Sequence, residues 1–305
     1  MVFFSLQEHR LENLKDINLE RCEFITILPK LWAPNLENLD LAYCENLVKL
    51  PKLWAPNLEN LDLSYCKILV EIDECFGSLE KLKRWDLSNC RKLQFLPSQL
   101  RLKSLDSFYL TGCSSLEKLP NFHQEMECLQ YLLLDKSGIR EVPSSIEHLT
   151  KLSTLRLYKC KKLRDLPDCI YKLQKLQELA TTTAKLRPTC NSFDSSSGYG
   201  FVNMKLLDFW HYENIIELDL LMKPDYFPAL ESIILSETNI VTIPESISKF
   251  PRLKSLYIRN CKLLSEIQGL PQSISVVHAE NCMLLDSQSG LSLSLRYKYF
   301  TRFAK

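Results

Sequence analysis

The sequence predicts an α/β repeat solenoid, a fold in which one short unit recurs along the chain. The first observation is a tandem duplication, because residues 29–50 and 51–72 are nearly the same text. The two blocks differ at five pairs of positions: Ala42/Ser64, Glu45/Lys67, Asn46/Ile68, Lys49/Glu71 and Leu50/Ile72. The second observation is the apolar spacing inside a block, which reads L-x-x-L-x-L-x-x-C from Leu36 to Cys44. That spacing, with a period of about 20–29 residues, defines a leucine-rich repeat.

Each repeat is expected to contribute one short strand, marked by the alternation Leu39-Asp40-Leu41. Successive side chains of a strand point to opposite faces, so both leucines point inward and Asp40 points outward. One unit cannot bury its leucines alone, and stacked units place their strands side by side in a parallel sheet. We therefore expect a leucine-rich-repeat horseshoe with a parallel concave sheet and a mostly irregular or 3-10 convex side.

The leucine spacing is regular in some parts of the chain and interrupted in others, and this predicts five segments. They are a partial N-terminal coil at 1–13, regular repeats at 14–188, a Ser/Gly-rich insertion at 189–203, C-terminal repeats at 204–286 and a basic, aromatic tail at 287–305. The insertion is predicted because clustered serines and glycines are typical of surface loops.

Three local features inside the repeats carry predictions of their own. Trp85 and Phe108 stand at leucine positions, so we expect them to fill the core. Gly138 belongs to a coil that is one residue shorter, where a glycine eases the tighter turn. The text Ser144-Ser145-Ile146-Glu147 has the pattern of a capping box before a short helical turn on the convex side, of the 3-10 type.

The bulk composition is that of a folded protein, with 46% hydrophobic and 25% charged residues. A net charge of +1 gives no argument for binding nucleic acid or a membrane surface. No apolar run is long enough to predict a transmembrane helix. The first residues lack the basic region and long apolar stretch of a secretory signal, so the cytoplasm, and secondarily the nucleus, is the expected compartment.

The twelve cysteines follow the repeat instead of forming an evident disulfide framework. Eight of them occupy the same repeat position: Cys22, Cys44, Cys66, Cys90, Cys113, Cys160, Cys261 and Cys282. A small, weakly polar side chain fits the turn that leaves the strand, and its S–H can reach a backbone carbonyl of the adjacent coil. We therefore predict reduced structural thiols, which fits a cytosolic protein.

Several longer phrases resemble a known family. They are PNLENLDLAYCENLVKLP, SGIREVPSSIEHLTKLSTLRLYKCKKLRDLP and LPQSISVVHAENCMLL. These phrases, within a similarity that spans about Leu11 to Leu285, closely resemble the repeat domain of plant intracellular disease-resistance receptors of the TIR-bearing, nucleotide-binding branch. The resemblance implies a curved solenoid that recognises pathogen effectors and contributes to autoinhibition of the receptor.

The chain departs from the family pattern because it contains no G-x-x-x-x-G-K-[ST] motif for nucleotide phosphates. Two interpretations stay open at this point. The chain is the recognition domain of a larger receptor, or it is a stand-alone intracellular adaptor or decoy without a signalling module. A secreted repeat inhibitor is a weaker third alternative.

No enzyme is expected, and no cofactor or metal site. The five histidines fall at unrelated repeat positions, and no Ser/His/Asp or Cys/His arrangement can be assigned to one face. Catalysis requires a sequestered pocket, which an open sheet rarely offers.

Function is instead expected on the solvent-facing positions of the concave sheet. The column between the two strand leucines runs Asn18, Asp40, Asp62, Asp86, Tyr109, Leu133, Arg156, Ala180, and later Ile234, Tyr257 and His278. The next column is expected to contain Tyr43, Tyr65, Tyr158, Lys159 and Arg259. Tyrosine and arginine are enriched at the hot spots of protein interfaces, although a solvated strand face explains any one of them alone.

The predicted protein-binding residues are Asp40, Tyr43, Asp62, Tyr65, Asp86, Tyr109, Tyr131, Leu133, Arg156, Tyr158, Tyr257 and Arg259. The expected ligand is a protein, either a pathogen effector or a host protein, and not nucleic acid. From the resemblance, a nucleotide-binding domain of the same receptor is a further expected partner.

Overall fold

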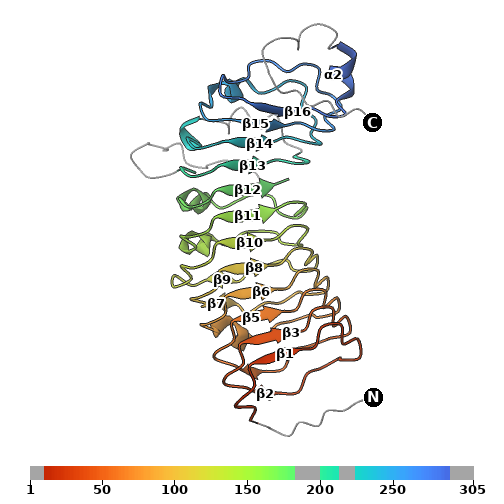
Figure 1. Cartoon of the computed structure of the whole chain (residues 1–305), viewed down its shortest axis with the longest axis vertical. Helices are drawn as coiled ribbons and strands as arrows, with labels where there is room; N and C mark the ends of the chain where they lie inside the picture. The colour runs from red at the N-terminus through yellow and green to blue at the C-terminus, as the bar shows by residue number, and fades with distance from the viewer. Residues whose placement is uncertain (1–9, 183–199, 213–223, 289–305) are drawn as a thin grey trace. The chain divides into compact units, whose positions relative to one another are not determined.

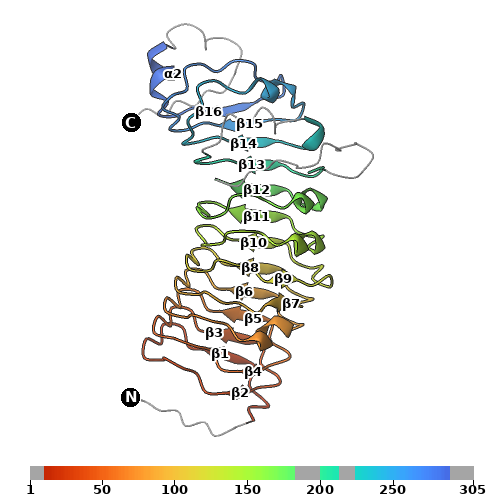
Figure 2. The same cartoon turned by 180° about the vertical axis from the view of Figure 1, so that it is seen from behind.

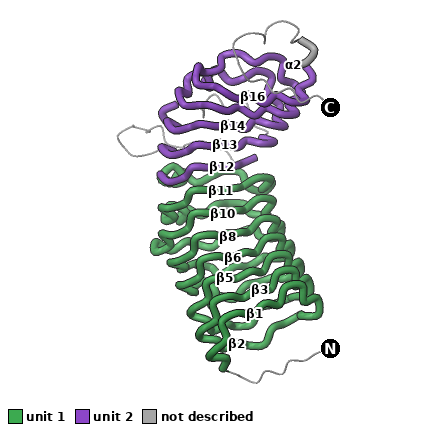
Figure 3. The backbone as a smooth tube through the Cα atoms, viewed as in Figure 1, with its two compact units in different colours: residues 1–173 green, residues 174–305 purple. Residues whose placement is uncertain are grey.

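The computed structural model describes residues 10–182, 200–212 and 224–288. The chain divides into two compact units, unit 1 at residues 1–173 and unit 2 at residues 174–305 (Figure 3). Both units are leucine-rich-repeat solenoids in which each coil contributes one short strand to a parallel sheet. The predicted fold class is confirmed.

Unit 1 contains seven strands of this sheet, one above another in chain order (Figure 1). They are β1 (Asp16–Asn18), β3 (Asn38–Asp40), β5 (Asn60–Asp62), β6 (Arg84–Asp86), β8 (Ser107–Tyr109), β10 (Tyr131–Leu133) and β11 (Thr154–Leu157). Within the described part of unit 2, the strands are β12 (Glu178–Thr181), β13 (Leu206–Asp208), β14 (Ser232–Ile234), β15 (Ser255–Tyr257) and β16 (Val276–His278).

The side of the coils away from this sheet is mostly irregular, as the sequence predicts. Two short parallel pairs lie there in unit 1, β2 (Leu31–Trp32) with β4 (Leu53–Trp54), visible in Figure 2, and β7 (Gln99–Leu100) with β9 (Asn121–Phe122). The 3-10 helices among the described residues are η1 (Glu74–Ser78), η2 (Ser144–His148), η3 (Asp168–Lys172), η5 (Pro224–Tyr226) and η6 (Glu245–Lys249). In the part of the chain that the structure describes there is one α-helix, α2, at Met283–Gln288. Within the described residues, every helix is too short or too polar to span a bilayer.

The repeat leucines form the core. Leu36, Leu39, Leu41 and Leu47 are at most 2% exposed, and equivalent positions in later coils are buried to the same degree. Trp85 and Phe108 are fully buried and stack with ring centroids 5.1 Å apart, so their prediction as core residues is confirmed.

A further buried column lies three residues before the first leucine of each repeat. Its members include Ala33, Ala55, Leu79, Leu102, Met126, Leu149, Leu173, Phe201, Phe227 and Phe250. Phe201 shows that the repeat has resumed before Met204, because its backbone N–H bonds to Tyr226 and its carbonyl accepts the Met204 N–H. The described end of the predicted 189–203 insertion is thus packed into a coil. The rest of that insertion and nearly all of the predicted 287–305 tail lie outside the described residues.

The chain leaves each strand through a residue in the left-handed region, just before the cysteine position. Arg21, Tyr43, Tyr65 and Asn89 have φ between 59° and 62°, and Gly112 has φ of 79°. The backbone N–H of this residue donates to the next coil, for example from Tyr43 to Ser64 at 2.8 Å. The coil-to-coil ladder therefore continues through the turn.

Gly138 has a different role from the one expected. The left-handed residue of its short coil is Lys136, with φ of 59°. At Gly138 a Cβ atom would lie 2.2 Å from the carbonyl oxygen of Ser114. Glycine is therefore required because a neighbouring backbone approaches closely.

The thiol contact predicted for the cysteine column is confirmed. The Sγ atoms of Cys44, Cys66, Cys90 and Cys113 donate to the carbonyls of Leu19, Leu41, Leu63 and Leu87 in the preceding coil, at 3.1–3.3 Å. The same contact joins Cys160 to Leu134 at 3.0 Å and Cys282 to Ile258 at 2.9 Å.

The helical turn predicted after Pro143 is present as the 3-10 helix η2, but the capping box is not. Pro143 is the residue that precedes the helix, and no side chain caps it. The Ser145 hydroxyl instead accepts the backbone N–H of Phe122 at 3.0 Å. The prediction was wrong because the helix begins at Ser144 itself, so the serine of the Ser144-x-x-Glu147 pattern lies inside the helix and not at the capping position before it.

The first prediction concerns the interior. Leu63 is 0% exposed, so Leu63→Asp should lower the free energy of unfolding by more than about 3 kcal/mol by burying an unpaired charge. Ile27→Asp is the matched control because Ile27 is 67% exposed, and it should stay within about 0.5 kcal/mol of the wild type. Urea denaturation measures both, and equal losses would contradict the assignment of Leu63 to the core.

The second prediction concerns the thiols. Burial raises the pKa of Cys66 to about 12 and also raises the pKa of Cys90 and Cys113. The reactive thiolate is therefore scarce at pH 8, and burial excludes the reagent. Iodoacetamide should leave these three cysteines unmodified in the native protein and modify them in denaturant. The partly exposed Cys128 is the control. Peptide mass spectrometry that finds Cys66 and Cys128 labelled equally fast in the native state would overturn this interpretation.

Candidate protein-recognition surface

The first predicted column of the sheet face is confirmed in unit 1. Strand register places Asn18, Asp40, Asp62, Asp86, Tyr109, Leu133 and Arg156 side by side on consecutive strands. A partner on this face would therefore meet carboxylates at one end of unit 1 and aromatic, aliphatic and basic groups at the other.

The aspartates of this column have a structural task. Asp40, Asp62 and Asp86 each accept the backbone N–H two residues further on, with Oδ1–N distances of 2.8–2.9 Å. Such a bond closes a turn at the end of the strand. Asp86 is also only 8% exposed and lies 3.2 Å from a guanidinium nitrogen of Arg84. Contrary to expectation, Asp86 presents little surface to a partner.

Tyr43 and Tyr65 form a rigid aromatic column at the left-handed positions. Their rings stack with centroids 4.4 Å apart and planes 6° apart. The Arg21 guanidinium lies 5.3 Å from the centre of the Tyr43 ring, within range of a cation–π interaction. Both tyrosines are partly exposed, so this column is available for contact.

The second predicted column needs a correction. Tyr43 and Tyr65 align with Lys159, whereas Tyr158 and Arg259 align with Ala42 and Ser64, one residue earlier in the repeat. Tyr158 is only 9% exposed, its N–H donates to Asp135 Oδ1 at 2.8 Å, and the Lys159 ammonium lies 4.8 Å from its ring centre. Tyr158 is therefore buried beneath the sheet face and offers little surface to a partner.

Four of the remaining predicted residues lie on the adjacent strands β8, β10 and β11, namely Tyr109, Tyr131, Leu133 and Arg156. Tyr131 is 40% exposed, and Leu133 lies between Tyr109 and Arg156 in the register. Arg84 covers Tyr109, with its guanidinium carbon 4.9 Å from the ring centre. Sequence reasoning missed this contact. Arg84 occupies the same strand position as Tyr131 and lies on the strand next to Tyr109, and this shared position could have revealed it.

Arg156 is held in place on the same face. Its Nε donates to Asp135 Oδ2 at 3.0 Å, so the guanidinium is fixed before any partner binds. We call Arg84, Tyr109, Tyr131, Leu133 and Arg156 the central cluster.

Unit 2 carries its own aromatic group on the sheet face. Tyr257 and His278 stack with centroids 4.9 Å apart, and Arg259 lies 5.9 Å from the Tyr257 ring centre. Arg259 also forms an ion pair with Glu280 at 3.5 Å. Asp208 belongs to this column through its register with Ile234, and it was missed although Leu207-Asp208-Phe209 repeats the alternation of the earlier strands.

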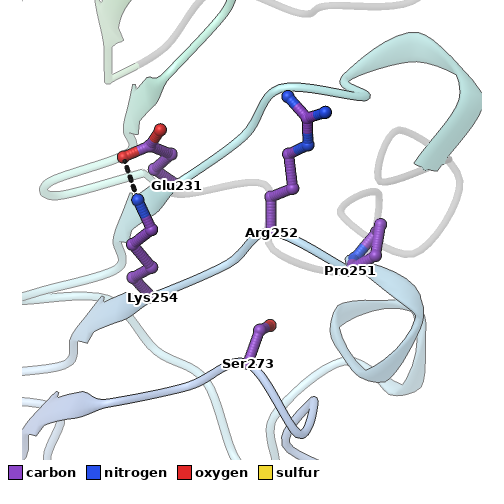
Figure 4. Close-up of a pocket in the computed structure, with 5 residues that line it drawn as sticks. All are labelled: Glu231, Pro251, Arg252, Lys254 and Ser273. Atoms are coloured by element: carbon purple, nitrogen blue, oxygen red, sulfur yellow. Dashed lines mark hydrogen bonds and ion pairs between the residues drawn. The ribbon is translucent and has the colours of Figure 1, made fainter.

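Unit 2 also contains a hollow of about 410 Å³ (Figure 4). It is lined by residues that precede strands β14, β15 and β16. Its lining residues are Glu231, Pro251, Arg252, Lys254 and Ser273. Within the described residues, no group of three or more His, Cys, Asp or Glu side chains is arranged to hold a metal ion.

Comparison with known families identifies the repeats. The family model described as "Disease resistance protein RPS4B-like, leucine-rich repeats" matches residues 101–303, and a general leucine-rich-repeat model matches residues 57–79. The chain is 29% identical to disease resistance-like protein DSC1 of Arabidopsis thaliana over 217 residues. It is 30% identical to the Arabidopsis protein SUPPRESSOR OF npr1-1, CONSTITUTIVE 1 over 233 residues. With TMV resistance protein N of Nicotiana glutinosa the identity is 27% over 260 residues.

These alignments cover 70–73% of this chain but only 16%, 14% and 23% of the three relatives. The chain thus corresponds to a small part of each relative. Among solved structures, the leucine-rich-repeat protein LIC12759 of Leptospira interrogans covers 89% of this chain, and the match covers 85% of that protein, at 16% identity and a TM-score of 0.37.

The third prediction tests whether the Asp62 carboxylate stabilises the turn at the end of its strand. Asp62→Ala removes the carboxylate that accepts the Ser64 N–H, and it should lower the free energy of unfolding by about 1 kcal/mol. Asp62→Asn keeps an acceptor oxygen and should cost less than half of that. Thermal and urea unfolding of the two variants make the comparison. If both variants are as stable as the wild type, the carboxylate does not stabilise the turn.

Proposed function

The chain belongs to the RPS4B-like leucine-rich-repeat family of plant disease-resistance proteins, and from that premise we propose that it recognises a protein ligand in plant defence. The ligand is a pathogen effector or a host protein, and it binds the central cluster on the sheet face of unit 1. In the same proposal the domain contributes to autoinhibition by contacting a nucleotide-binding domain of its receptor, in the cytoplasm or the nucleus.

One observation supports this site more than the others. Tyr131 and Leu133 flank a buried leucine on one strand and are both accessible, while their neighbours are already fixed by contacts within the protein. Tyr109 lies under Arg84, and Arg156 is paired with Asp135. A binding surface that is ordered in advance loses little conformational freedom when its partner arrives. Large aromatic and arginine side chains are also the groups that dominate binding energy at protein interfaces.

The second candidate function is that of a stand-alone intracellular adaptor or decoy. It uses the same surface and differs only in having no signalling module to restrain. Binding to the nucleotide-binding domain of a related receptor separates the two candidates, because autoinhibition requires that contact and an adaptor does not.

The fourth prediction tests the surface. A partner captured from plant cytosol by the wild-type chain is purified, and its Kd is measured by surface plasmon resonance. Tyr131→Ala and Leu133→Ala should each weaken binding at least about tenfold, since hot-spot truncations have effects of this size. Phe95→Ala is the control because Phe95 is 59% exposed in unit 1 but lies away from the sheet, in a bridge with Glu71. A partner that responds to Phe95→Ala and ignores both sheet-face variants would refute the proposed site.

A further inference from the structure

The hollow in unit 2 is built by three consecutive coils. Glu231 immediately precedes β14, Arg252 and Lys254 precede β15, and Ser273 precedes β16. Its volume of about 410 Å³ falls within the range of sites that hold small ligands or short peptide segments. Ser273 donates its hydroxyl to the Leu253 carbonyl at 2.8 Å, which fixes the loop between two of these coils.

Positive charge exceeds negative charge around this hollow. Lys254 Nζ forms an ion pair with Glu231 Oε2 at 3.0 Å, and this pair is electrically neutral. The hydrogen bond and charge of Lys254, with smaller contributions from the charges of Lys205 and Arg252, hold the pKa of the Glu231 carboxyl below the ordinary value. Among the residues that line the hollow, two cations, Arg252 and Lys254, therefore accompany one carboxylate.

Arg252 is the side chain best placed to use this excess. Among the described residues none forms a hydrogen bond or ion pair with its guanidinium. In Figure 4 the side chain of Arg252 extends beside the Glu231–Lys254 pair without a contact to it. Within the described part of the chain its N–H donors are thus unused, while the neighbouring lysine is already paired with Glu231.

We propose that this hollow binds a side-chain carboxylate from an acidic segment of a protein partner, with Arg252 donating two parallel N–H bonds to its oxygens. A planar guanidinium fits a carboxylate in this bidentate manner. The Glu231–Lys254 pair forms one wall, and Pro251 restricts the backbone on the other side. The inference rests on the proposed function as a protein-recognition domain, but it assigns a second contact site, in unit 2.

The test uses a fluorescein-labelled peptide with four alternating aspartate and glutamate residues between glycines, and its twin with asparagine and glutamine. Fluorescence anisotropy measures binding to the 305-residue chain. Arg252→Ala should weaken binding of the acidic peptide about tenfold, as expected for loss of a charge-assisted bidentate contact. Arg252→Lys keeps the positive charge but loses the two parallel N–H donors, so its Kd for the acidic peptide should lie between those of the wild type and Arg252→Ala. The neutral twin should not bind.

The matched control is Lys262→Ala, which removes one exposed cation from another part of unit 2 and should change Kd less than twofold. Equal effects of Lys262→Ala and Arg252→Ala would show attraction by overall charge and overturn the site. Binding of the neutral twin, or displacement of the peptide by inorganic phosphate at a lower concentration than by acetate, would overturn the carboxylate assignment.

The two proposals can fail separately. Tyr131→Ala lies in unit 1 and should leave binding of the acidic peptide unchanged. If Arg252 variants behave as expected while Tyr131→Ala has no effect on the captured partner, the carboxylate site in the hollow is supported and the proposed binding site in unit 1 is refuted. The opposite pattern removes the hollow and retains the proposed function. Circular dichroism of each variant confirms that exposed substitutions leave the fold intact.

Discussion

The structure depends on the fact that one coil cannot bury its own apolar side chains. Leu39 and Leu41 are at most 2% exposed because coils lie on both sides of them. Ile17 and Leu19, at the same repeat positions in the first described coil, remain partly exposed. Stacking also satisfies the polar groups, since strand N–H groups, turn N–H groups and cysteine thiols all donate to a neighbouring coil. Burial and hydrogen bonding thus come from the same contact, which makes each coil dependent on the next.

Stacking at a fixed period places like positions in columns, and the duplicated blocks show the consequence. Copied aromatic residues stack on each other across the coils. The ring centroids of Trp32 and Trp54 are 4.7 Å apart, and those of Tyr43 and Tyr65 are 4.4 Å apart. An exact copy of a charged residue instead places like charges side by side, as it does at Asp40 and Asp62, and a reversed charge avoids this repulsion. Two of the five differences between the blocks reverse a charge, and both produce an ion pair across the coils, Glu45 with Lys67 and Lys49 with Glu71. The divergence of the blocks has a physical basis at these positions.

The same columns divide the sheet face between structure and recognition. Asp40 and Asp62 close turns at the ends of their strands, and the buried Tyr158 lies beneath the surface. In the described structure Tyr131 and Leu133 neither close a turn nor fill the core, so their side chains are available to contact a partner. In unit 2, Lys254 is paired with Glu231, and among the described residues that line the same hollow Arg252 is the cation without such a partner. Candidate binding residues are thus those that remain after the requirements of the solenoid are met.

The sequence by itself determined the interior and the register. The spacing of Leu36, Leu39, Leu41 and Cys44 is a local pattern with a period, and it predicted the buried positions, the parallel sheet and the thiol contact to the neighbouring coil. It also predicted the column from Asp40 to Arg156. Only the tertiary structure decided how certain individual residues are used: Ser145 as a partner of Phe122, and Gly138 as a point of close approach to Ser114. The reason is physical. Burial of leucine requires only an apolar neighbour, which the repeat guarantees, whereas a hydrogen bond or a steric limit depends on one atom in a coil more than twenty residues away, and repeat spacing does not specify that atom.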